Sequence, residues 1–309
     1  MSAGRNAAPK HEGPDRSRRL IALIRLSRPT ILPAGVLAYA LGLTMGYAAN
    51  GRLNWGPALA GLAVTLLANL MAHYADEYAD VDTDRLTRRT PFTGGSGVLP
   101  AGALEPSTAL QAARICLALS LLATALLFAT SVLPAACVVL AILGIVGGWV
   151  YSMPPIALER RGWGEVDNAA LGGFVMPLMA YASQTGKVSL EAVLVLAPIF
   201  GLVLLNLLGT HWPDRAADAQ VGRRSLAVLL GRRARQAHHA LVLAIYLGVL
   251  LLASRGMPRE VALGVLLSLP VALWAAFVYG RQESPLPSSL TMVVGMVGAG
   301  AGWIAAGSV

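Results

Sequence analysis

The chain has few charged side chains. Asp, Glu, Lys and Arg make up 13% of its 309 residues, hydrophobic residues make up 56%, and the mean hydropathy is +0.62. A soluble domain carries about 25% charged residues, so this composition excludes an ordinary soluble fold. The chain also has only two cysteines, Cys116 and Cys137. Both fall inside apolar stretches, where cysteine acts as a small packing residue and does not report the redox compartment.

Long apolar runs fill most of the sequence. Each is about 20 residues long, which is enough to cross the hydrocarbon core of a bilayer as a helix. Nine such runs lie at 21–49, 54–75, 104–130, 133–153, 164–184, 188–212, 236–254, 259–280 and 287–308. The first is the least regular, because Arg25, Arg28 and Pro29 interrupt it. The sequence therefore predicts an all-α integral membrane protein with nine transmembrane helices.

Basic residues are unevenly shared between the connections of the predicted helices. Most arginines lie in the N-terminal tail and in the loops after runs two, four, six and eight, and few lie in the other loops. Because basic loops stay on the cytoplasmic side, we expect a cytoplasmic N-terminus. Residues 1–19 are then a disordered basic tail, and residues 20–309 form one transmembrane domain.

The net charge of +8 follows from this topology. Arginines at a membrane surface attract anionic lipid, so we expect membrane lipid as a partner and no nucleic acid. The expected location is the inner membrane of a bacterium.

Two acidic segments end predicted helices on the cytoplasmic side. Where the helix continues, acids four residues apart share one face and repel each other unless a cation lies among them. Mg²⁺ prefers carboxylate and phosphate oxygens, so the pattern predicts Mg²⁺ ions that bridge these acids to a diphosphate. The alternative interpretation is an acidic helix end that is simply exposed to solvent. The predicted metal ligands are Asp76, Glu77, Asp80 and Asp84 in the first segment and Asp214 and Asp218 in the second. The matching positions of the two segments indicate two pseudo-repeated halves.

An arginine-rich loop follows each acidic segment. Glycines in the first loop, at 94–97, let backbone N–H groups approach an anion, and arginine side chains bind phosphate oxygens. We therefore predict that the diphosphate is bound by Arg88, Arg89, Arg223 and Arg224. The alternative is that these arginines are only part of the positive charge of the cytoplasmic loops. Upstream, Asn69 must be hydrogen-bonded where it is buried, and it is a candidate contact for substrate.

Two histidines occupy equivalent places in the acidic segments. His73 and His211 each precede an aspartate by three residues. Both a metal or proton-transfer role and a simple hydrogen bond at a helix end agree with this spacing. We keep both histidines as candidate contacts for the acceptor or the prenyl group.

Several motifs in the same order resemble those of the UbiA superfamily of membrane prenyltransferases. Residues 73–84 resemble its NDxxDxxxD signature, and residues 214–228 resemble its second DxxxD with the trailing GKxTLAV segment. Residues 25–29 are similar to the start of the family's first helix, and residues 151–165 to its loop between helices four and five. The resemblance covers nearly all of the predicted membrane domain.

The resemblance implies nine helices around a central cavity and Mg²⁺-dependent transfer of a prenyl group from an isoprenoid diphosphate. The catalytic residues it implies are Asp76, Asp80, Asp84, Asp214 and Asp218. It also implies that Tyr151 contacts substrate and that Arg161 or Arg160 replaces the family's loop lysine. The chain departs from the family at Asp76 and Glu77, which stand where Asn and Asp are usual, and at Arg223, which stands where lysine is usual.

The acceptor is predicted from two short segments. Residues 93–100 and 184–186 look more like the 1,4-dihydroxy-2-naphthoate prenyltransferases than like the 4-hydroxybenzoate enzymes, so we expect an aromatic acceptor of that kind. Two alternatives stay open. One is a terpene cyclase of the same superfamily, which needs no acceptor, and the other is a secondary transporter, whose site would lie near the membrane midplane.

Overall fold

The computed structural model describes residues 16–87, 89 and 94–307, and no β-strand occurs among them. Within this part of the chain, eight helices are long and apolar enough to cross a membrane. They are α2 (Leu32–Asn50), α3 (Trp55–Ala79), α5 (Pro106–Ala129), α6 (Ala135–Ser152), α9 and α10 together (Leu190–His211), α12 and α13 together (Leu226–Ala253), α14 and α15 together (Arg259–Val278) and α16 (Leu286–Ala306). The all-helical membrane fold predicted from the sequence is confirmed.

The fifth predicted span, 164–184, is not among these eight; it is helical but not one regular helix. It consists of α7 (Gly164–Ala170), a π-helical turn (Leu171–Val175) and α8 (Met176–Thr185). The second residue of α8 is Pro177, which has no N–H to continue the regular α-helical bonding. A π turn of this kind is a common local solution where a helix is interrupted, often beside a functional site.

The first predicted span begins too early in the sequence. A separate helix, α1 (Arg16–Leu26), precedes α2, and Arg28 between them has a left-handed backbone with φ of 52°. Pro29 follows and cannot donate a helical hydrogen bond, so the membrane helix starts only at Leu32. Of the predicted tail, residues 16–19 belong to α1 and residues 1–15 lie outside the described residues.

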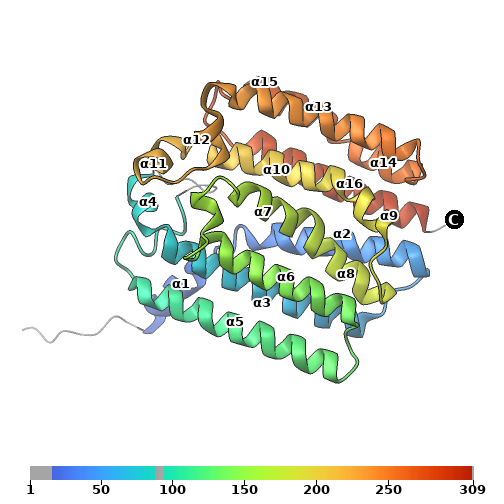
Figure 1. The fold of residues 1–309 in the computed structure, drawn as a ribbon, viewed down its shortest axis with the longest axis horizontal. Coiled ribbons are helices and arrows are strands. Elements are labelled where there is room, and N and C mark those ends of the chain that lie inside the picture. Colours follow the sequence, from blue (N-terminus) through green and yellow to red (C-terminus); the bar gives the residue numbers. More distant parts are fainter. Residues whose placement is uncertain (1–15, 88, 90–93, 308–309) are drawn as a thin grey trace, which may run out of the picture.

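The helices lie side by side, and several short helices lie together at one end of the bundle (Figure 1). We call this the site end; it carries α1, α4 (Val81–Leu86), α11 (Arg215–Gln220) and α12 (Leu226–Leu230). Helix α3 packs on α5 and α6, and α10 packs on α7, α13 and α16. Since α4 follows α3 as α11 follows α10, each acidic segment occupies the same local arrangement.

Helices α14 (Arg259–Leu266) and α16 meet at two glycines. A Cβ atom on Gly264 would lie 2.0 Å from the carbonyl oxygen of Gly298, and a Cβ on Gly298 would lie 2.0 Å from the carbonyl oxygen of Gly264. Small residues allow this close approach, which drives helix association in lipid, where the hydrophobic effect does not.

We expect Gly298→Ala to separate α14 from α16 and to lower stability by roughly 1–3 kcal/mol, as other overpacked sites do. The measurement is the thermal unfolding midpoint of the purified protein in detergent. The matched control is Gly248→Ala in α13 (Ala234–Ala253), where a Cβ meets nothing within 4 Å. That variant should keep or raise the midpoint, because alanine favours a helix by about 1 kcal/mol over glycine. Equal midpoints for the two variants would contradict the close contact.

Candidate active site

A cavity of about 1080 Å³ occupies the middle of the bundle and reaches the site end. Its apolar lining includes Val64, Leu140, Val175, Met179, Val203 and Met296. Its charged lining gathers at the site end and consists of Asp76, Asp80, Asp84, Asp214 and Asp218 with Arg25, Arg28, Arg89 and Arg223. One elongated chamber thus joins a charged mouth to an apolar interior.

The first acidic segment keeps helical spacing through the end of α3. The backbone N–H of Asp80 donates to the carbonyl of Asp76 at 2.9 Å, and the N–H of Asp84 donates to the carbonyl of Asp80 at 2.8 Å. The three aspartates consequently lie along one face, as the spacing predicts, and all three line the cavity.

The second acidic segment repeats this arrangement after α10 (Ala197–His211). The N–H of Asp218 donates to the carbonyl of Asp214 at 2.9 Å, and both side chains line the cavity. The hydroxyl of Ser225 donates to Asp218 at 2.7 Å, which fixes one carboxylate oxygen and leaves Oδ1 without a hydrogen-bond partner among the described residues. The two segments therefore face one chamber from separate helices.

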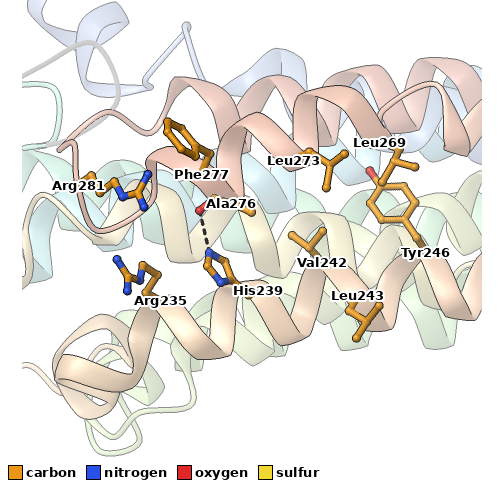
Figure 2. A pocket seen from close by; sticks show the side chains of 10 residues that line it. All are labelled: Arg235, His239, Val242, Leu243, Tyr246, Leu269, Leu273, Ala276, Phe277 and Arg281. Atoms are coloured by element: carbon orange, nitrogen blue, oxygen red, sulfur yellow. Dashed lines mark hydrogen bonds between the residues drawn. The ribbon is translucent and has the colours of Figure 1, made fainter.

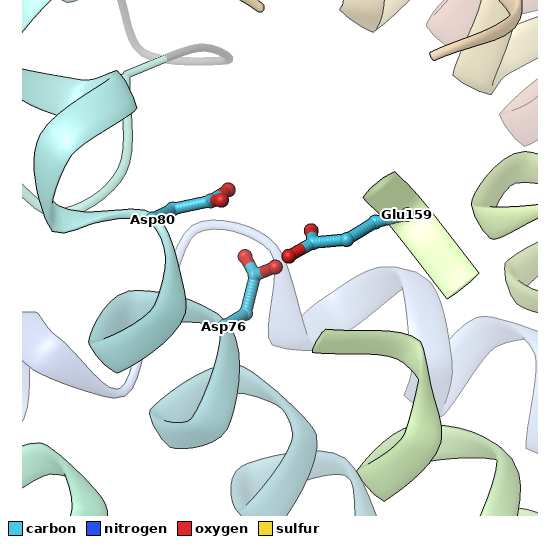
Figure 3. Close-up of side chains that lie close together, drawn as sticks. All are labelled: Asp76, Asp80 and Glu159. Carbon is cyan, nitrogen blue, oxygen red and sulfur yellow. The ribbon is translucent and has the colours of Figure 1, made fainter. Parts of the chain in front are cut away.

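A third segment adds a carboxylate that the sequence reasoning missed. Glu159 lies in a short 3₁₀ turn (Leu158–Arg160) between α6 and α7, and its side chain is 1% exposed. Figure 3 shows its carboxylate turned toward those of Asp76 and Asp80, and oxygens of the three lie within 4.8 Å of one another. The sequence shows this residue beside Arg160 and Arg161, so the loop looked like another basic loop.

Two arginines compensate these acids. Arg28 donates to Asp76 at 2.6 Å and also to Glu77. Arg223 donates to Asp80 at 2.6 Å, and its Nη2 atom lies 2.8 Å from Glu159, although not aligned as a hydrogen bond. Each guanidinium therefore bridges two carboxylates, and Arg223 joins the segments that follow α3, α6 and α10.

Burial makes the charged form of these acids costly despite the arginines. Burial raises the pKa of Asp80 to about 6, although the positive charge of Arg223 lowers it. It also raises the pKa of Asp214 to about 6, although His211 lowers it. Burial raises the pKa of Asp84 to about 8, although the positive charge of Arg28 lowers it. It raises the pKa of Glu159 well above its ordinary value. Further positive charge at this place would favour the ionised carboxylates.

Glu77 has a different place from the one predicted for a metal ligand. Its carboxylate accepts the backbone N–H and the hydroxyl of Ser96, both at 2.6 Å, and the guanidinium of Arg28. It does not line the cavity. Glu77 instead anchors the glycine-rich loop to α3, and Gly95 of that loop lies so close that a Cβ would come 2.0 Å from Asp84.

The predicted diphosphate arginines divide into two groups. Arg89 and Arg223 line the cavity, whereas Arg161 and Arg224 are exposed and do not. Arg161 turns away because its guanidinium donates to the carbonyl of Pro155 at 2.7 Å. Arg88 lies outside the described residues. Arg28 was not among the predicted diphosphate contacts, yet it lines the cavity, whereas Arg161 and Arg224 do not.

The predicted acceptor and prenyl contacts all line the cavity: Asn69, His73, Tyr151 and His211. His211 pairs through Nδ1 with Glu165 at 2.9 Å, and Glu165 also accepts the backbone N–H of Leu226 at 2.6 Å. This pairing favours the hydrogen-bonded interpretation for His211. The hydroxyl of Tyr151 lies 3.4 Å from Arg223, at the boundary between the charged and apolar linings.

The residues present suit a hard divalent cation. Within the described part of the chain, Asp80, Asp84 and Asp218 each keep one buried carboxylate oxygen without a hydrogen-bond partner, and Glu159 keeps both of its oxygens without one. Mg²⁺ takes oxygen ligands and shares them with substrate phosphates. Carboxylates of the three segments therefore offer the donor set that Mg²⁺ requires.

Comparison with known proteins agrees with this fold. The protein is 27% identical over 281 residues to 1,4-dihydroxy-2-naphthoate octaprenyltransferase of Bacillus subtilis (strain 168), covering 89% of this chain and 86% of that one. A solved UbiA homolog from Archaeoglobus fulgidus, bound to DMAPP and Mg²⁺, has the same fold with a TM-score of 0.67 and 18% identity, covering 90% of this chain and 98% of that chain. A UbiA homolog from Aeropyrum pernix K1 has a TM-score of 0.68 and 18% identity, covering 88% and 97%. The profile of the UbiA prenyltransferase family matches residues 35–297, and the chain therefore belongs to that family.

Proposed function

We propose that this prenyltransferase moves a prenyl group from an isoprenoid diphosphate to an aromatic acceptor, with Mg²⁺ held at the site end. The observation that carries the proposal is the cavity, whose carboxylates and arginines open onto a deep apolar interior. The Archaeoglobus fulgidus homologs bound to DMAPP or GPP together with Mg²⁺ support the donor class and the metal.

The charged mouth is suited to a diphosphate. Mg²⁺ at such a site neutralises the charge that develops on a leaving diphosphate. The residues that would hold it are Asp76, Asp80, Asp84, Glu159, Asp214 and Asp218. Arg28, Arg89 and Arg223 stand at the same mouth, where guanidinium groups bind diphosphate oxygens and stabilise the departing anion.

The apolar interior is suited to the prenyl chain. Val64, Leu140, Met179 and Met296 line the chamber beyond the charged residues and exclude water from the allylic carbon. When the C–O bond of the donor breaks, the carbon becomes carbocation-like, and the dry lining protects it until the acceptor attacks. The cavity volume of about 1080 Å³ exceeds what a small ligand fills, which agrees with a long chain.

The acceptor we propose is 1,4-dihydroxy-2-naphthoate or a related quinone precursor. The Bacillus subtilis relative supports this choice, together with the similar segments 93–100 and 184–186. Asn69 and His73 lie one turn apart on α3 and line the cavity between the acids and the apolar chamber. They are the polar side chains we assign to orienting the acceptor.

We further propose a bacterial inner-membrane location with the site end facing the cytoplasm. The support is the distribution of arginines, which gather in the loops at that end. A cytoplasmic mouth would receive the diphosphate group of the donor at the membrane surface, while the prenyl chain and the product stay in lipid.

We expect Asp80→Asn and Asp218→Asn each to reduce prenyl transfer about 100-fold or more, because each removes an oxygen ligand from the site. Chelation of Mg²⁺ should have the same effect on the unaltered protein. The assay is product formation from a prenyl diphosphate and an aromatic acid, with acceptor-free reactions to reveal any cyclised product. Asp82→Asn is the matched control, because Asp82 is 82% exposed and pairs with Arg85. Retained activity in Asp80→Asn and Asp218→Asn would remove the proposed site.

We expect Arg223→Gln to lower kcat/KM for the prenyl diphosphate about 100-fold, because it removes positive charge from the mouth. Arg223→Lys should restore part of the activity, since the charge returns without the planar fork. Arg224→Gln, at the exposed neighbouring position, should stay within about twofold, as exposed charges contribute little. Similar losses in the Arg223 and Arg224 variants would argue against a specific role for Arg223.

We expect Glu159→Gln to weaken Mg²⁺ binding, because one charged oxygen donor is lost. The Mg²⁺ concentration that gives half of the maximal stabilisation should rise about tenfold. The measurement is the thermal midpoint across a Mg²⁺ titration. Without Mg²⁺, the same variant should lose little stability, because burial already disfavours the charged form of Glu159 and glutamine keeps its size. Glu191→Gln, exposed in the first turn of α9 (Leu190–Val195), is the control. An unchanged titration for Glu159→Gln would exclude this residue from the metal site.

A further inference from the structure

A second hollow lies on the outer surface of the bundle, away from the cavity described above. It is a groove of about 450 Å³ between α13 and α15 (Leu269–Val278). Its walls are mostly apolar and come from Val242, Leu243, Tyr246, Leu269, Leu273 and Phe277. Leu243, Leu273 and Phe277 are 61%, 58% and 67% exposed, so the groove faces the surrounding lipid.

Positive charge gathers at one end of this groove. Figure 2 shows Arg235, in the first turn of α13, and Arg281, just beyond α15, at the same end. Among the described residues, neither guanidinium forms an ion pair, and none of the ten residues that line the groove is acidic. Glu283, two residues after Arg281, pairs with Arg215 instead at 3.0 Å. Two unpaired cations therefore stand together at the mouth of an apolar groove.

The local structure holds these cations at the mouth. The guanidinium of Arg281 lies 4.4 Å from the ring centre of Phe277, a cation–π contact that keeps it over the groove. The Nε2 atom of His239 pairs with the carbonyl of Ala276 at 2.8 Å and ties α13 to α15 just inside the mouth.

The depth of the groove matches one leaflet of a bilayer. From Arg235 to Tyr246 along α13 there are 11 steps, which at 1.5 Å per residue is about 16 Å, roughly half of a 30 Å hydrocarbon core. At the inner end, the hydroxyl of Tyr246 is hydrogen-bonded to Ser268 at 2.8 Å. The polar group there is already satisfied, so the inner end offers only apolar surface.

We propose that this groove binds one anionic phospholipid, with its phosphate between Arg235 and Arg281 and an acyl chain along the apolar walls. The two arginines favour an anionic lipid over a helix of another protein. A helix would need an acidic side chain at the mouth to pair with them, whereas the phosphate of an anionic lipid lies at that depth in the membrane. Arginines at a membrane surface attract anionic headgroups, by about fivefold for each residue. This site is independent of the proposed reaction.

The test is native mass spectrometry of the full-length protein in detergent with equal amounts of phosphatidylglycerol and phosphatidylcholine. We expect preferential retention of phosphatidylglycerol, reduced about fivefold by Arg235→Gln or by Arg281→Gln and about 30-fold by both together. Leu273→Trp fills the apolar wall and should reduce retention of both lipids. Thermal midpoints confirm that each variant is folded.

Arg232→Gln combined with Arg233→Gln is the matched control, because these arginines are exposed in the preceding 3₁₀ turn (Gly231–Arg233) and do not line the groove. This pair should leave the headgroup preference unchanged. Equal retention of the two lipids by the unaltered protein would overturn the proposal, and so would a preference that survives loss of both Arg235 and Arg281. A dimer that Leu273→Trp converts to a monomer would instead identify the groove as a contact between copies of the chain.

Discussion

Carboxylates buried close together must be matched by positive charge, and the structure of the site end depends on this constraint. Asp76, Asp80 and Glu159 bring oxygens within 4.8 Å of one another at the head of an apolar chamber. An ion removed from water loses several kcal/mol of hydration, so such a cluster is stable only with cations in contact. Arg28 and Arg223 provide this contact, and they do so from segments far from the acids in the sequence. The compensation therefore also holds the separate parts of the site end together.

The same constraint explains why the proposed diphosphate site fits here. The unaltered chain places an excess of acids over arginines at the mouth, and buried oxygens of Asp80, Asp84 and Asp218 remain unpartnered within the described ranges. Divalent cations would satisfy these oxygens, and their charge would then exceed what the acids need, leaving the mouth attractive to phosphate. The apolar lining strengthens each of these interactions because it keeps water away.

Local patterns in the sequence predicted the parts of the site that lie within one segment. The i, i+4, i+8 spacing placed Asp76, Asp80 and Asp84 on one face, because helical geometry is set by neighbours along the chain. Contacts between distant segments carried no such signal. Glu159 resembles any acid in a basic loop, and the adjacent Arg223 and Arg224 differ only in the direction that the fold gives them. The interruption within 164–184 was likewise hidden by continuous hydropathy, whereas Arg25, Arg28 and Pro29 already marked the first run as irregular.

Glu77 shows how one buried acid connects the site to its supporting loop. Through Arg28 it shares a cation with Asp76, and through Ser96 it fixes the loop whose Gly95 lies against Asp84. The carboxylate of Glu77 reaches three partners at once, which leaves no oxygen turned to the cavity. A residue in the middle of the first acidic segment thus acts by positioning: it sets where Arg28, Asp76 and the glycine loop stand. One turn of this helix therefore has two faces, one toward the cavity and the other toward the loop that encloses it.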